Sequence, residues 1–177
     1  MDNSKSAVIL VGHGGLPSDM PSEIVEKFMR VHKGRVKSGE SITEQEQELD
    51  STIRKWERTK ETDPYKFGLE SLASSMKPFL SDYIIKTAYN EFCFPTIEEA
   101  VAELVEGGAS HVSIITTMIT RGGSHSEKEI PGEVQSLCSK YKNIHIEYAW
   151  PFDMEAFALF LSTHVQGFNS NSMVDAK

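Results

Sequence analysis

Two short runs of apolar residues do most to limit how this chain can fold. Residues 7–12 read AVILVG, and residues 111–119 read HVSIITTMI. Both are near-continuous apolar runs rich in β-branched side chains, which a strand buried on both faces requires. Both faces of a sheet are covered when helices connect parallel strands. The two runs therefore predict a parallel α/β sheet.

Two further strands and four helices complete this prediction. The strands are expected at residues 83–91 and 144–150, and the helices at 64–80, 96–105, 128–140 and 153–165. The clearest helix is the one that starts at Thr96, which can cap its amino end. Strands that alternate with helices favour right-handed crossovers and a parallel sheet. The expected fold class is therefore α/β, with four parallel strands.

A charged stretch separates the first strand from the rest of this pattern. Residues 20–63 carry charges of both signs around an apolar stripe, which predicts one or two amphipathic helices inserted after strand 1. These helices can be a solvated face, a lid or a dimerisation arm.

The length of 177 residues suits one compact domain, 1–177. The polar end, about 169–177, is expected to be frayed.

Composition excludes several classes of protein. The formal net charge is -8, and nucleic-acid binding needs clustered Lys and Arg, so no nucleic-acid partner is expected. No run of about 18 apolar residues is present to cross a membrane. Cys93 and Cys138 are far apart, which supports neither a disulfide framework nor a zinc ribbon. Without a recognisable secretory signal, the predicted location is cytoplasmic.

Three side chains are predicted to meet at the carboxyl edge of the sheet. His13 follows the first strand between two glycines, which let the backbone turn there, and His125 follows the strand at 111–119. Ligands bind at this edge in open parallel sheets, and imidazole is the commonest ligand for transition metals. Glu91 ends the strand at 83–91 and can add an oxygen ligand or accept a proton, although a lone carboxylate there often only bonds a loop. Together they predict a metal site.

Other readings of these segments are weaker. The glycine-rich segment after the first strand lacks both the GxGxxG and the Walker A spacing, so nucleotide binding is not favoured. Gly12 stands where a histidine phosphatase would need an arginine. The remaining histidines are interpreted as surface or structural residues: His32, His111, His145 and His164.

Three motifs in order resemble one known family. They are Gly-His-Gly at 12–14, Ala-Tyr-Asn-Glu at 88–91 followed by Pro-Thr-Ile-Glu-Glu-Ala at 95–100, and His125 followed by Ile-Pro at 130–131. This pattern resembles the class II tetrapyrrole chelatases of the CbiX and SirB type, which are sirohydrochlorin cobaltochelatases or ferrochelatases. The resemblance covers the first strand and roughly residues 82–165. The long segment 20–63 carries no chelatase motif and departs from the short members.

The resemblance implies a fold, a reaction and an assembly. The fold would be a chelatase-like three-layer sandwich, here a single lobe with a helical insertion after strand 1. Since two lobes enclose the macrocycle in the family, a homodimer is implied. The reaction would insert a divalent metal, itself a substrate, into sirohydrochlorin or a related tetrapyrrole, with no organic cofactor. An alternative is a non-catalytic carrier of metal or tetrapyrrole with the same fold.

The resemblance also assigns the site residues. His13, Glu91 and His125 would be the metal-binding and catalytic residues, and would accept the pyrrole protons. Nitrogen and oxygen ligands suit Co²⁺, Fe²⁺ or Ni²⁺ without choosing among them. The substrate carries many carboxylates, which a chain of net charge -8 would repel unless local groups compensate. The expected substrate-binding residues are Gly14, Arg121, Gly122, Gly123 and Ser124.

Overall fold

Four parallel strands form the centre of the fold. The structure is a computed structural model that describes residues 5–172, without the side chains of residues 36 and 169–172. The strands are β1 (Lys5–Gly12), β2 (Tyr83–Tyr89), β3 (Ala109–Thr116) and β4 (His145–Tyr148). They pair in the order β2-β1-β3-β4, and each neighbouring pair is parallel. The predicted four-stranded α/β fold is confirmed.

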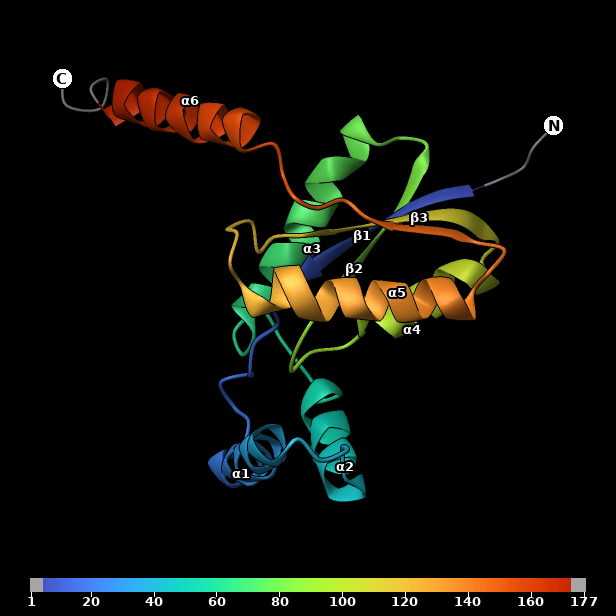
Figure 1. The fold of residues 1–177 in the computed structure, drawn as a ribbon. Helices are drawn as coiled ribbons and strands as arrows, with labels where there is room; N and C mark the ends of the chain where they lie inside the picture. Colours follow the sequence, from blue (N-terminus) through green and yellow to red (C-terminus); the bar gives the residue numbers. More distant parts are fainter. Residues whose placement is uncertain (1–4, 173–177) are drawn as a thin grey trace.

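Helices cover the sheet on two sides (Figure 1). The helices α4 (Ile97–Glu106) and α5 (Ile130–Lys140) pack on the side to which Ile9 of β1 points. The helix α3 (Pro64–Met76), which a 3-10 turn at Lys77–Phe79 follows, packs on the side to which Leu10 points. Successive side chains of a strand face opposite ways, so β1 is buried on both faces, as its apolar sequence predicted.

The charged stretch after β1 holds two helices, α1 (Ser22–Ser38) and α2 (Glu44–Arg54). They lie together beyond the end of the sheet at which β1 stops (Figure 1). Met20, Phe28 and Ile53 form a small buried cluster between them. The pair therefore has its own apolar contacts, and its position places it near the carboxyl ends of the strands.

Three strands end earlier than the sequence predicts, and for β4 the end is Tyr148 instead of residue 150. β2 stops at Tyr89, because Phe92 soon after adopts a left-handed backbone with φ 57°, outside the strand region. β3 stops at Thr116, whose hydroxyl donates to the Val11 carbonyl and accepts from the Met118 N–H. These bonds turn the chain out of the sheet. Glu91 is therefore a loop residue and not the last residue of a strand.

The predicted cap of α4 is confirmed. The Thr96 side chain accepts a hydrogen bond from the Glu99 N–H at 3.2 Å, and the Glu99 carboxylate accepts one from the Thr96 N–H at 2.9 Å. This reciprocal pair satisfies two N–H groups that a helix start otherwise leaves unpaired. It fixes where the chain leaves the loop that carries Glu91.

The last helix, α6 (Met154–Ser172), continues beyond the predicted end at 165. Residues 169–172 of the tail that was expected to fray are thus helical, while 173–177 lie outside the described residues. Figure 1 shows α6 extending away from the sheet.

Within residues 5–172, no helix has the length and apolar character needed to span a bilayer. The cytoplasmic location stays a prediction.

Candidate metal-binding site

The structure brings together the three side chains that the sequence singled out. His13, Glu91 and His125 each offer one ligand atom, and these atoms lie within 4.8 Å of one another. His13 Nε2 is 3.7 Å from Glu91 Oε2, and the two imidazole rings have centroids 4.9 Å apart. All three residues are partly exposed. Two nitrogen donors and one oxygen donor that converge in this way can hold a divalent transition metal.

Backbone pairing beyond the strands places Glu91 beside His13. The Asn90 N–H donates to the Gly12 carbonyl at 2.9 Å, and the Glu91 N–H donates to the His13 carbonyl at 2.8 Å. The contact between β1 and β2 therefore continues into their loops. The His13 N–H donates to the Tyr65 hydroxyl at 2.8 Å, so α3 also holds the turn.

Both histidines are oriented by hydrogen bonds at Nδ1. His13 Nδ1 lies 2.8 Å from the Gly14 carbonyl oxygen, and His125 Nδ1 lies 2.8 Å from Glu129 Oε2. Both of these partners are acceptors, and the amide Nδ2 of Asn90 near His125 Nδ1 has Glu129 Oε2 as its own acceptor, so the hydrogen-bond network assigns the proton of each neutral ring to Nδ1. The Nε2 atoms are then free to bind a metal, as in carboxylate–histidine–metal sites.

Asn90 and Glu129 support His125, and the sequence reasoning missed both. Asn90 Nδ2 donates to Glu129 Oε2 at 3.1 Å and lies 2.9 Å from His125 Nδ1. Burial raises the pKa of Glu129, but the hydrogen bonds with His125 and Asn90 outweigh it, so the net shift is downward. Glu129 therefore stays ionised near neutral pH. Its position four residues after His125 was the available signal, since such residues share one face of a helical segment.

Two arginines of the inserted segment hold the loops of the site. Arg54 donates to the carbonyls of Asn90 and Cys93, at 3.1 and 3.0 Å. Arg58 donates to the Gly15 carbonyl at 2.8 Å and to the Phe92 carbonyl. The segment after β1 therefore fixes the loops that carry His13 and Glu91. Nothing in the charged sequence distinguished these arginines from those that face solvent.

The predicted substrate-binding residues 121–124 lie in the loop between β3 and a π-helical turn (His125–Glu129). All four are exposed, and Arg121 Nε lies 3.7 Å from Glu127 Oε1. Within the described part of the chain, no hydrogen bond or ion pair joins them to the three ligand side chains. The loop precedes His125 directly in the sequence.

Gly14 has a backbone that only glycine adopts readily, with φ +92°. A Cβ added there would lie 1.8 Å from the Glu91 carbonyl oxygen. We expect Gly14→Ala to destabilise the fold by at least about 1–3 kcal/mol and to lower Co²⁺ affinity at least about 10-fold, because the loop of Glu91 must move. Thermal unfolding and titration calorimetry measure the two effects.

Gly15→Ala is the matched control, because its added Cβ would meet no atom closer than 3.9 Å. Its unfolding temperature and Co²⁺ affinity are expected to stay close to wild type. A Gly14→Ala protein that binds Co²⁺ like wild type would show that the close approach of these two loops does not matter to the site.

This arrangement, a parallel α/β sheet with two histidines and a glutamate at its carboxyl edge, is an α/β domain with a candidate metal site. The model of the CbiX family matches residues 39–159, which is more than half of the chain. The chain therefore belongs to the CbiX family, as the sequence motifs predicted. The matched range contains Glu91 and His125 but starts after His13.

Two curated relatives share shorter segments with this chain. It is 26% identical over 72 residues to the sirohydrochlorin ferrochelatase of Priestia megaterium, and 25% identical over 79 residues to that of Bacillus subtilis (strain 168). These segments cover 41% and 45% of this chain, and 27% and 30% of the relatives. The matched part is thus less than a third of each relative's length.

One solved structure is similar over almost its whole length. It is described as a cobalamin (vitamin B12) biosynthesis CbiX protein from Marinobacter aquaeolei VT8, with 16% sequence identity and a TM-score of 0.57. The match covers 96% of this chain and 98% of that chain. At this level of identity the comparison supports the fold alone.

Proposed function

We propose that this protein is a chelatase that inserts a divalent metal ion into sirohydrochlorin or a related tetrapyrrole. The observation that carries the proposal is the convergence of His13, Glu91 and His125 within 4.8 Å. Three protein ligands leave coordination positions open, so an ion can be held and then passed to the four nitrogens of a macrocycle. The curated relatives are sirohydrochlorin ferrochelatases, which supports this substrate class.

The proposed metal substrates are Co²⁺, Fe²⁺ and Ni²⁺. Imidazole nitrogen suits each of these borderline ions, and the single carboxylate adds one harder oxygen. A closed site with four protein ligands would hold the ion as a structural element. The open set found here suits an ion that must leave after each reaction.

The loop at residues 121–124 and Gly14 are proposed to bind the carboxylates of the substrate. Arg121 is 66% exposed, which leaves its guanidinium accessible, and guanidinium matches the geometry of a carboxylate. A local cation is needed, because the formal net charge of the chain is -8 and disfavours a polycarboxylate.

A homodimer is proposed as the working assembly, because a single copy supplies one lobe. The exposed apolar side chains of α6 support this part of the proposal. Leu159, Phe160, Val165 and Phe168 are 57% to 69% exposed. An apolar row of this kind typically marks a contact surface, and a second copy of the chain would cover it.

Replacing Phe160 and Phe168 together by Ser is expected to convert the dimer into a monomer, because both rings are more than half exposed on α6 and would lose their contact area. Light scattering after size-exclusion chromatography measures the mass. Ser162→Ala on the same helix is the control and is expected to leave the mass unchanged. A wild-type protein that runs as one copy at all concentrations would contradict the dimer.

An anaerobic assay tests the proposed reaction. Purified protein is mixed with sirohydrochlorin and excess Co²⁺, Fe²⁺ or Ni²⁺, and visible spectra follow the metallated product. We expect many equivalents of product per protein, at a rate above that of the metal and macrocycle alone. Binding of one equivalent without product would indicate a carrier and contradict a chelatase.

A further inference from the structure

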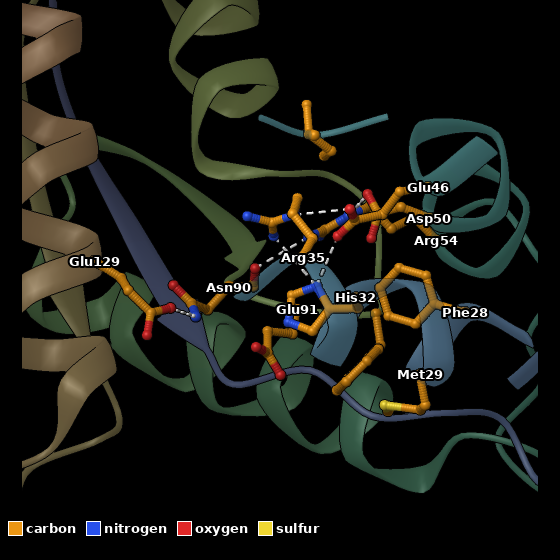
Figure 2. A pocket seen from close by; sticks show the side chains of 12 residues that line it. Phe28, Met29, His32, Arg35, Glu46, Asp50, Arg54, Asn90, Glu91 and Glu129 are labelled. Carbon is orange, nitrogen blue, oxygen red and sulfur yellow. Dashed lines mark hydrogen bonds and ion pairs between the residues drawn. The ribbon is translucent and has the colours of Figure 1, made fainter. Parts of the chain in front are cut away.

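A cavity of about 420 Å³ lies between the helical insertion and the loop of Glu91. Figure 2 shows Asn90 and Glu129 at one side of it, and His32, Arg35 and Glu46 joined by contacts at the other. Its charged and titratable lining residues are His32 and Arg35 of α1, Glu46, Asp50 and Arg54 of α2, the candidate ligand Glu91, and Glu129, which pairs with His125. His32 and the ligand Glu91 therefore face one space.

His32 is held in one orientation at the wall of this cavity. Its Nδ1 lies 2.8 Å from Glu46 Oε1, and its ring stacks on Phe28 with centroids 5.4 Å apart. Arg35 Nη2 is farther from the same nitrogen, at 3.4 Å. The nearer partner is a carboxylate, which only accepts, so the network assigns the proton of the neutral ring to Nδ1. His32 Nε2 then carries a lone pair.

Glu46 is a buried carboxylate whose charge is fixed. It is 1% exposed, and Arg35 Nε donates to its Oε2 at 2.7 Å. The hydrogen bond from Arg35 is the main reason that the pKa of Glu46 is lowered, with His32 adding to it against the effect of burial. An ionised carboxylate at Nδ1 stabilises the imidazolium that forms when Nε2 takes a proton.

Metal insertion also needs groups that accept protons. The tetrapyrrole loses two pyrrole N–H protons when it binds the ion. A ligand atom that coordinates the ion has its lone pair engaged and cannot take these protons at the same time. Among the described residues, no hydrogen bond engages His32 Nε2. His32 therefore offers an uncommitted basic nitrogen on a residue that lines this space from the insertion side.

We infer that His32 is a general base of the proposed reaction and that Glu46 is its positioning residue; this inference rests on the proposed function. His32 Nε2 takes the proton of a pyrrole N–H. The electron pair of that bond stays on the pyrrole nitrogen, which then binds the ion. The imidazolium releases the proton to water, and the neutral ring takes the second proton, so one inserted ion yields two protons.

The same contacts would also serve a purely structural histidine that ties α1 to α2, and an Asn variant separates the two roles. The side-chain amide of His32→Asn can still donate to Glu46 in place of Nδ1, but it has no basic nitrogen. We expect its kcat for metal insertion to fall about 100-fold, a typical loss for a missing general base, with KM and Co²⁺ affinity near wild type. His111→Asn, on the exposed start of β3, is the matched control.

Chemical rescue provides the second readout. His32→Ala leaves space in the cavity, so added imidazole is expected to restore at least a tenth of the wild-type kcat, at concentrations that do not change the wild-type or His111→Asn rates. A wild-type rate for His32→Asn, or a slow His32→Ala enzyme that imidazole does not restore, would overturn the role of His32. An inert wild-type protein would instead overturn the proposed function and this inference with it.

Discussion

His125→Ala is expected to abolish metal insertion and to weaken Co²⁺ binding by at least about 100-fold. The variant removes one of three converging ligand atoms, and even loss of a residue that only supports a ligand typically costs 10- to 100-fold in affinity. Calorimetry measures the affinity, and the sirohydrochlorin assay measures the rate. His13→Ala is expected to behave in the same way.

His145→Ala is the control for this prediction, because His145 begins β4 and its side chain is 61% exposed. It keeps the number of histidines equal to that of the test variants. Circular dichroism must show that all three variants fold, which is expected because His13 and His125 are not buried in the core. Insertion at the wild-type rate by either test variant would contradict the proposed metal site.

The sheet and the convergence of the three candidate ligands could be predicted from the sequence because both follow from general rules. Buried parallel strands need near-continuous apolar runs, and β1 is such a run. Parallel strands end at one edge, so residues that follow them converge whatever the loops do. Glu91 reached the site although its strand ends two residues earlier than predicted.

The support that Arg54 and Arg58 give to the site could not be predicted, because in the sequence these arginines lie far from the loops that they hold. Arg58 reaches Phe92 across 34 residues, and charge alone does not tell a buried arginine from an exposed one. His32 and Glu46 are 14 positions apart in the sequence and lie on different helices. Their pairing depends on how α1 packs on α2, which no local pattern in either helix specifies.

Arg58→Ala is expected to lower the free energy of unfolding by about 3–5 kcal/mol, the usual cost of removing one partner of a buried ion pair. The side chains of Arg58 and Asp63 are only 3% and 2% exposed, so Asp63 would be left as a buried, uncompensated charge. Each kcal/mol lowers the unfolding temperature of a domain of this size by about 2–4 °C. Calorimetric unfolding measures the shift, and Lys55→Ala, at an exposed neighbour, is expected to change stability by less than about 0.5 kcal/mol.

A double variant separates the ion pair from the hold on the site loops. Asp63 Oδ1 accepts the Lys66 N–H at 3.0 Å as the cap of α3, and Asn caps a helix about as well as Asp. Arg58→Met with Asp63→Asn therefore removes both charges, keeps the cap and is expected to regain part of the lost stability. It still lacks the bonds to the carbonyls of Gly15 and Phe92, so Co²⁺ affinity is expected to stay at least about 10-fold below wild type. Full recovery of Co²⁺ affinity along with stability would mean that Arg58 serves the fold and not the metal site.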